Sequence, residues 1–285
     1  MAMVAGGRWK RWLFLYLPLA AFVVITLFPF YYMTVTSLRP DREMYVSWNR
    51  PNFAPFWTLK PTLEHFVYLF QRTIFVRWLL NTMIIATLST AIALFCGVLA
   101  AYALARLRFP LGGTLGTGIF VTYLVPQTLL FIPLGEVIRS FHLSDSLWAL
   151  ILTYPTFLIP FCTWLMMGYF RTIPKELEEC AHIDGASRVQ AMVRIVFPVA
   201  MPGILSAGIF AFTNAWNEFL YALVFLNTPA HRTIPVGVVA DLVKGDTFFW
   251  GPLMAGALLG SVPVAFFYSF FVEQYVSAMT GAVKG

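Results

Sequence analysis

Charged residues are scarce in this sequence. Lys, Arg, Asp and Glu together make up 11% of the 285 residues, whereas hydrophobic residues make up 59%. A soluble domain carries about a quarter charged residues, and the mean hydropathy here is +0.75. The low charge excludes an ordinary soluble domain and indicates a polytopic, all-α membrane protein.

Patterns for disulfides, metals and nucleotides are also missing. The three cysteines, Cys96, Cys162 and Cys180, give no disulfide framework and no metal spacing. The histidines lie far apart, and there is no phosphate-binding loop and no nucleophile–base arrangement. The basic residues form no continuous face, so the net charge of +6 does not indicate nucleic acid. The sequence therefore predicts no catalytic residue, no metal and no cofactor bound by this chain.

Six apolar runs are long enough to cross a membrane, which takes about 20 helical residues. The first run follows a basic stretch, and it is too long for the apolar part of a cleavable signal, so we expect it to be retained. The chain is then divided into an N-terminus at 1–11, one transmembrane domain at 12–277 and a tail at 278–285. The predicted spans are 12–37, 78–105, 111–138, 146–170, 199–226 and 247–276.

The topology follows from an even number of spans, which places both termini on one side of the membrane. Lys and Arg favour the cytoplasmic side in short loops, and the basic residues at 8–11 and 106–108 therefore predict cytoplasmic N- and C-termini. The apolar runs between them predict contact with membrane lipid. The outer loop 38–76 fits two descriptions equally well, an irregular extracytoplasmic lobe or a set of aromatic interfacial anchors.

One polar segment, Glu176–Pro198, interrupts the apolar runs. The glutamates at its start suit the positive end of a helix dipole. Gly185 predicts a helix stop, and Ser187 with Gln190 predicts a capping box for a second helix that ends at Pro198. The segment predicts two short helices around a glycine turn. These form either a rigid knob for a cytoplasmic partner or a solvated loop.

The same segment resembles a known motif. It is similar to the EAA loop of binding-protein-dependent ABC importer permeases at Glu179-Cys180-Ala181, Asp184-Gly185-Ala186, Ile195 and Pro198. Cys180 and Phe197 replace the Ala and Leu of that pattern. Stretches at 212–220, 233–237 and 261–285 resemble further parts of carbohydrate permeases. The chain is thus similar to the MalG-like permease subunit of a sugar importer.

This resemblance implies the type I ABC importer permease fold, with six transmembrane helices and a cytoplasmic coupling helix in the loop 171–198, located in the inner membrane. It implies that the chain is not an enzyme, and that an ATPase subunit dimer uses ATP and Mg. The other implied partners are a MalF-like second permease subunit, an extracytoplasmic solute-binding protein and the sugar. The residues implied to face the ATPase are Glu176, Glu179, Cys180, Ala181, Asp184, Gly185 and Ala186, with Gly281 and Lys284 in the tail.

Glu218 is the one acid well inside a predicted span, and an intramembrane carboxylate indicates a functional site by default. Asn214, Trp216 and Asn217 lie beside it, and this combination suits the hydroxyl groups and the apolar face of a sugar. The alternative is a polar patch that holds helices together.

The outer loop 227–249 resembles the loop that meets the binding protein, and a plain connector is the alternative. The residues implied to make that contact are His231, Arg232, Thr233 and Pro235. An autonomous secondary transporter or channel is the competing function. It would need inverted repeats or several buried acids, and the sequence has one buried acid and no repeat, which favours the importer.

Overall fold

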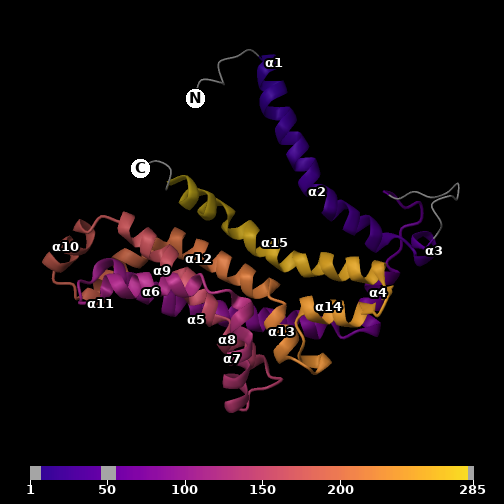
Figure 1. Cartoon of the computed structure of the whole chain (residues 1–285). Coiled ribbons are helices and arrows are strands. Elements are labelled where there is room, and N and C mark those ends of the chain that lie inside the picture. The colour runs from indigo at the N-terminus through magenta and orange to yellow at the C-terminus, as the bar shows by residue number, and fades with distance from the viewer. Residues whose placement is uncertain (1–7, 46–55, 282–285) are drawn as a thin grey trace. The chain divides into compact units, whose positions relative to one another are not determined.

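The computed structural model describes residues 8–45 and 56–281, and these are almost entirely helical (Figure 1). Within the described residues, the only strands are β1 (Val243–Lys244) and β2 (Thr247–Phe248), which pair as an antiparallel hairpin. Gly245 in the hairpin turn has a φ of +60°, a conformation that glycine adopts at little cost. The predicted all-α class is confirmed.

The chain divides into two compact units. The first unit combines Met1–Phe75 with Val238–Ser261, and the second combines Val76–Gly237 with Val262–Gly285. The helices that lie in the N-terminal part of the first unit are α1 (Arg8–Arg11), a π-helical turn at Trp12–Tyr16, α2 (Leu17–Leu38), α3 (Asp41–Met44) and α4 (Glu64–Arg72).

The first unit presents α2 as a bare apolar helix. None of the most apolar stretch within Trp12–Leu38 is buried, as suits a helix whose solvent is lipid. In the same unit, His65 on α4 is buried, and its Nε2 lies 2.7 Å from the carbonyl oxygen of Arg39. A carbonyl oxygen only accepts, so this ring nitrogen donates a hydrogen bond and is not free to bind a metal beside Asp41 and Glu64.

The second unit contains most of the long helices, and α14 and α15 complete the chain. Its boundaries cut through α5, α14 and α15, each of which is a single helix. In chain order the helices are α5 (Phe75–Arg106), α6 (Gly112–Tyr123), α7 (Gln127–Ser140), α8 (Leu147–Thr153), α9 (Pro155–Thr172), α10 (Glu176–Ile183), α11 (Arg188–Ala191), a π-helical turn at Met192–Val196, α12 (Phe197–Asn217), α13 (Leu220–Phe225), a 3-10 turn at Pro229–His231, α14 (Ile234–Leu242) and α15 (Trp250–Gly281).

The described chain has five continuous helices long and apolar enough to cross a membrane. A sixth is added if α6 and α7 count as one span, because these two helices form an apolar pair bent by 98°. The third predicted run, 111–138, is therefore divided into two helices, where the sequence predicts a single span. Pro126 causes the break, because it lacks an amide proton and disfavours helical backbone at Val125.

The fifth predicted run, 199–226, starts earlier than predicted and is interrupted between Asn217 and Leu220. Its helix begins earlier, since α11, the π turn and α12 form one apolar helix from Arg188 to Asn217. Our prediction that Pro198 ends a separate short helix is wrong. The amide of Phe197 bonds to the carbonyl of Met192, five residues back, and this wider turn lets the helix continue through the proline.

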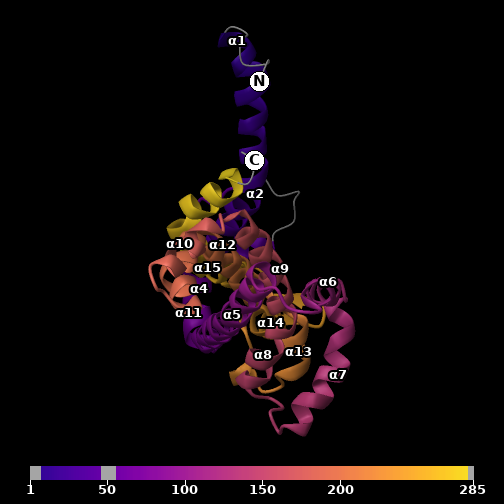
Figure 2. The same ribbon diagram turned by 90° about the vertical axis from the view of Figure 1, so that its left-hand side faces the viewer.

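Close helix packing in the second unit depends on small residues. α9 lies against α12 and against α6 (Figure 2). A Cβ at Gly203 of α12 would stand 2.6 Å from the ring of Tyr169 on α9, and a Cβ at Gly97 of α5 would stand 2.8 Å from the Cβ of Cys162. Glycine at these points lets the helices approach closely, as is common in membrane bundles.

Candidate functional site

The polar segment folds as α10 followed by a glycine turn. Three glutamates occupy the first turn of α10, where the helix dipole favours negative charge. At its end, the amide of Ala186 bonds to the carbonyl of Ala181 at 2.9 Å, and the amide of Gly185 bonds to His182 at 3.1 Å. These two bonds form a Schellman motif, and Gly185 has the φ of +85° that the motif requires. The predicted stop at Gly185 is confirmed.

The restart after the turn is also as predicted. Ser187 Oγ accepts from the amide of Gln190 at 3.3 Å, and the Gln190 side chain accepts from the amide of Ser187 at 2.7 Å. The reciprocal pair is a capping box. It starts α11, which continues directly into the long helix Arg188–Asn217. The turn after α10 is thus joined rigidly to a membrane helix.

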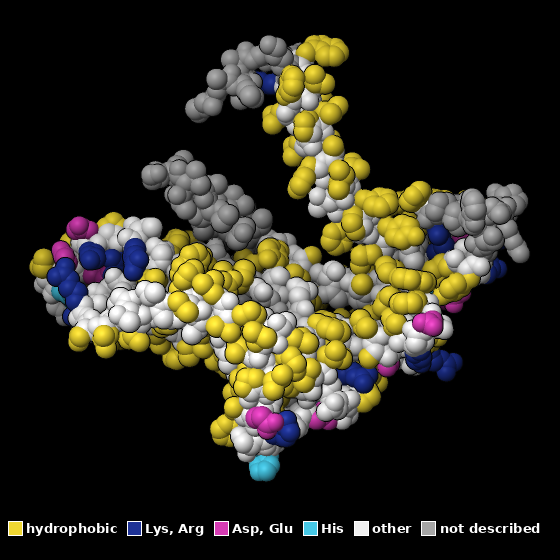
Figure 3. All heavy atoms as spheres, viewed as in Figure 1, with side chains coloured by type: hydrophobic (Ala, Val, Ile, Leu, Met, Phe, Trp, Pro, Cys, Tyr) yellow, Lys and Arg dark blue, Asp and Glu magenta, His cyan; other side chains and the backbone are white. Residues whose placement is uncertain are grey.

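The surface of this segment mixes charge with exposed apolar side chains. Figure 3 shows Lys, Arg, Asp and Glu side chains gathered over α10 and α11. Ile183 is 85% exposed and Val189 is 65% exposed, although both are large and apolar. Of the residues predicted to face the ATPase, Ala181 is buried and Ala186 is half-buried. Those that are exposed are Glu176, Glu179, Cys180, Asp184 and Gly185.

Glu178, which is not among the residues predicted to face the ATPase, attaches α10 to the end of α5. Its Oε1 lies 2.8 Å from Nε of Arg106, and its Oε2 accepts from the hydroxyl of Tyr102 at 2.8 Å. Arg106 also donates to the carbonyl of Ile173 at 2.7 Å. The two charged side chains are only 4% and 12% exposed. No local sequence pattern predicts this contact, because its partners are far apart in the sequence.

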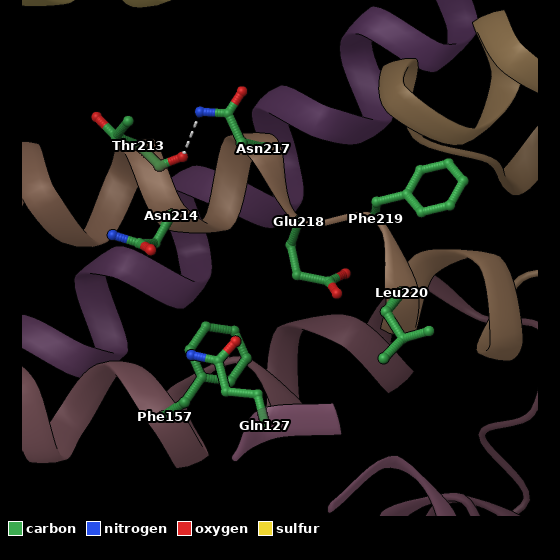
Figure 4. A pocket seen from close by; sticks show the side chains of 8 residues that line it. All are labelled: Gln127, Phe157, Thr213, Asn214, Asn217, Glu218, Phe219 and Leu220. Atoms are coloured by element: carbon green, nitrogen blue, oxygen red, sulfur yellow. Dashed lines mark hydrogen bonds between the residues drawn. The ribbon is translucent and has the colours of Figure 1, made fainter. Parts of the chain in front are cut away.

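A second feature is a cavity of about 360 Å³ at the break between α12 and α13 (Figure 4). Glu218 and Phe219 form the break, and the cavity also reaches α7 and α9. Of the four residues predicted to form a sugar site, Asn214, Asn217 and Glu218 line the cavity and Trp216 does not. Trp216 is buried and packs against Phe212. The complete lining is Gln127, Phe157, Thr213, Asn214, Asn217, Glu218, Phe219 and Leu220.

The carboxylate of Glu218 is engaged by the protein itself. It accepts from the amides of Tyr221 and Ala222 at 2.8 and 3.1 Å, and from the hydroxyl of Tyr154 at 2.7 Å. The two amides belong to the first turn of α13, so the carboxylate caps that helix. Hence Glu218 holds three helices together at the break, which is the alternative role that the sequence left open.

The side-chain amides of Asn214 and Asn217 bond to the backbone through their nitrogen atoms, which leaves their oxygen atoms unbonded to the helix. The side-chain NH₂ of Asn214 donates to the carbonyl of Phe210 at 2.9 Å, and that of Asn217 donates to the carbonyl of Thr213 at 2.9 Å. Their Oδ1 atoms are left as hydrogen-bond acceptors. The cavity thus combines acceptor oxygens with the apolar ring of Phe157, and this arrangement suits a ligand rich in hydroxyl groups.

The loop before α14 is held in place by α5. Trp78 Nε1 donates to the carbonyl of Pro229 at 2.9 Å, and the amide of Ile234 donates to Thr82 Oγ1 at 2.8 Å. Consequently the predicted contact residues are not fully open to a partner. Thr233 is 2% exposed, and His231, Arg232 and Pro235 are half-buried. The exposed residues of this loop are Asn227, Thr228 and Pro229.

Asp145, in the turn between α7 and α8, pins the exposed part of that loop. Its carboxylate accepts from the amides of Asn227 and Thr228 at 2.8 and 2.9 Å, and from the Thr228 hydroxyl. His231 Nδ1 lies 3.4 Å away. Burial raises the pKa of Asp145, but these hydrogen bonds outweigh it and lower the pKa to about 2.

The predicted tail contacts are described only in part. Gly281 is the last residue of α15, and Lys284 lies outside the described residues.

Comparison with known proteins places these features in a family. Residues 93–280 match the family described as binding-protein-dependent transport system inner membrane component. The chain belongs to this family. The matched range includes both the polar segment and the cavity, so the loop and the broken helices are parts of such a transport component.

Relatives of this family align along almost the whole chain. An Escherichia coli inner membrane ABC transporter permease protein, YcjP, is 37% identical over 95% of this chain and 95% of its own length. The trehalose/maltose transport system permease protein MalG of Thermococcus litoralis is 35% identical over 92% of this chain and 93% of its own. A sulfoquinovosyl glycerol transport system permease protein, SmoH of Agrobacterium fabrum, is 39% identical over 91% of this chain and 89% of its own length.

The fold is shared with a solved importer. A chain of a bacterial ABC transporter for the acidic polysaccharide alginate superposes with a TM-score of 0.79, covering 95% of this chain and 98% of that one. At 20% sequence identity this likeness concerns the fold alone. The expected type I importer permease architecture is confirmed.

Proposed function

We propose that this chain is the transmembrane permease subunit of an ABC importer that carries a sugar or sugar-like solute across the inner membrane by alternating access. The observation that carries the proposal is the family match together with relatives named as sugar permeases along nearly the full chain. In such an assembly this chain is not catalytic. ATP and Mg are used by a separate ATPase dimer, a MalF-like permease pairs with this chain, and a binding protein delivers the solute.

The polar segment Glu176–Pro198, from here on called the coupling segment, supports this assignment by its shape. α10 ends in a fixed Schellman turn, and the chain then enters a long helix, so a force on α10 reaches the membrane without a flexible linker. Exposed Ile183 and exposed acids offer a partner both apolar area and charge. We assign α10 to the groove of the ATPase, where Glu179 can pair with a basic side chain. The termini are then cytoplasmic.

The cavity at the α12–α13 break is proposed as part of the solute path. Non-helical backbone at membrane depth is tolerated where it lines a cavity or is buried in protein. Acceptor oxygens of Asn214 and Asn217 suit sugar hydroxyls, and Phe157 offers a ring to an apolar sugar face. Glu218 contributes mainly by holding the break open in one geometry.

The loop before α14 is proposed to meet the binding protein. Asn227, Thr228 and Pro229 are its exposed residues, and they are the ones we expect to touch the partner. His231 and Arg232 are half-buried and would contact it at their edges, whereas buried Thr233 and half-buried Pro235 shape the loop.

The test is reconstitution of the four-part importer in liposomes with its binding protein and a panel of labelled sugars. Uptake should need ATP, the ATPase subunits and the binding protein. Asn214→Leu should weaken uptake, while Thr117→Ala, an exposed helix position outside the cavity, should leave it unchanged. Uptake by this chain alone without ATP would contradict the proposal and indicate an autonomous transporter.

A further inference from the structure

α5 differs from the other long helices in the described chain. It runs for 32 residues without a break and contains no proline. Each of the other helices long enough to span carries an interior proline, for example Pro29 in α2 and Pro202 in α12. Prolines kink helices or loosen them locally. At 1.5 Å per residue α5 is about 48 Å long, more than the hydrocarbon core of about 30 Å, so both of its ends lie at membrane surfaces.

The C-terminal end of α5 is bonded to the coupling segment. Arg106, its last residue, forms the buried ion pair with Glu178 of α10 at 2.8 Å and donates to the carbonyl of Ile173. Tyr102, one turn earlier, donates to the other carboxylate oxygen at 2.8 Å. Breaking a buried pair leaves an uncompensated charge and costs far more than breaking a pair in water. This contact is therefore stiff.

The N-terminal end of α5 is bonded to the loop before α14. Trp78 donates to the carbonyl of Pro229, and Asn81 donates to the carbonyls of Ala230 and Arg232, each at 2.9 Å. Both side chains are buried, at 0% and 2% exposed. Side chains of α5 thus donate hydrogen bonds to three backbone carbonyls of a loop that has little regular structure of its own.

We propose that α5 is a strut that transmits movement between the coupling segment and the loop before α14. The proposal rests on the proposed function, because it assigns the two ends of α5 to the ATPase side and the binding-protein side. Arg106, Tyr102 and Glu178 are positioning residues at one end, and Trp78 and Asn81 are positioning residues at the other. A displacement of α10 reaches the outer loop through one unbroken helix.

A shared element predicts that both ends of α5 matter for the same process. If one rigid helix joins the two sites, weakening its contacts at either end should weaken the response of each site to the other, because both sites act through the same helix. A residue that only supports local folding would change the site it touches and leave the other unchanged.

The experiment compares reconstituted importers carrying Arg106→Gln or Asn81→Leu with the wild type. The measurements are sugar imported per ATP hydrolysed, and the factor by which loaded binding protein stimulates the ATPase. Each variant should lower both quantities by about fivefold or more, with the ATPase subunits still bound. The matched control is Arg108→Gln, since Arg108 is exposed and lies just beyond α5. It should stay within about twofold of wild type.

A charge reversal separates coupling from folding. Arg106→Glu alone should uncouple the importer, and adding Glu178→Arg should restore part of the sugar imported per ATP. Wild-type coupling in both Arg106→Gln and Asn81→Leu would overturn the strut. So would loss of the ATPase subunits from the Arg106→Gln complex, since that would assign Arg106 to assembly. A wild-type complex without ATP-dependent uptake would overturn the proposed function, and the strut with it.

Discussion

Asp145 offers a measurable link between one carboxylate and the order of the exposed loop. It accepts hydrogen bonds from two backbone amides and one hydroxyl of residues 227–228. Replacing it with Asn keeps the size of the side chain and removes its charge. We predict that Asp145→Asn loosens the loop at neutral pH, because charge-assisted hydrogen bonds are roughly twice as strong as neutral ones.

The magnitude follows from the pKa. The carboxyl of Asp145 titrates at about 2 in place of its ordinary 3.8. Since one pKa unit corresponds to about 1.4 kcal/mol, the shift corresponds to about 2 kcal/mol of preference for the ionised form in the fold. The side chain is 29% exposed, so solvent screening reduces the effect. We expect about 1–2 kcal/mol, or about 5- to 30-fold in the opening equilibrium of the loop.

The assay is hydrogen–deuterium exchange of the protein in nanodiscs at pH 7. Backbone amides of Asn227 and Thr228 should lose about tenfold protection in Asp145→Asn. Asp246→Asn, at an exposed acid in the β-hairpin, is the matched control and should change nothing at 227–228. Unchanged protection of these two amides in Asp145→Asn would refute the reasoning.

The sign of the pH dependence is fixed by the same shift. The folded pKa is lowered, so the stabilisation from Asp145 is complete above about pH 4 and disappears as the pH falls towards 2. The difference in thermal midpoint between wild type and Asp145→Asn should therefore shrink as the pH falls from about 4 towards 2. A difference that grows over this acidic range would contradict the assigned hydrogen bonds.

Three further predictions concern backbone geometry. Gly185→Leu meets no steric contact but forces a side chain into a φ of +85°, so uptake at equal membrane levels should fall, with about 1–2 kcal/mol of strain in the turn. Gly203→Ala should lower the thermal midpoint, because its Cβ would lie 2.6 Å from the Tyr169 ring, whereas Gly168→Ala, with nothing within 4 Å, should not. Ser187→Ala should speed amide exchange at the start of α11 by removing a cap worth about 1 kcal/mol, and Ser187→Asp should restore protection.

Local sequence chemistry predicted the turn of the coupling segment correctly. Gly185 and the Ser187–Gln190 pair act on atoms within a few residues, and such short-range preferences survive in the fold. The same local reasoning failed at Pro198. Proline disfavours a regular helix, but a wider π turn ahead of it satisfied the backbone and let the membrane helix begin early. Propensity does not reveal that a rarer helical geometry is available.

Contacts between distant segments were beyond the sequence. Glu178 looked like one of three equivalent glutamates in the first turn of α10, yet it alone turns towards Tyr102 and Arg106. Only its contact with the end of α5 distinguishes it. Glu218 was recognised as an acid inside a predicted span, but its three donors come from α13 and from the α8–α9 junction, which no spacing rule connects.

The breaks in the membrane helices fall on one cavity. Gln127, the first residue of α7, follows the α6–α7 break, and Glu218 lies in the α12–α13 break; both line the same space. The hydroxyl of Tyr221 on α13 donates to the carbonyl of Gln127 at 3.0 Å, so the two breaks also brace each other. Broken helices provide polar backbone and side chains where a solute must pass, but they transmit force poorly. An importer needs both properties, and this chain divides them, with the breaks around the proposed solute path and the proline-free α5 between the proposed coupling surfaces.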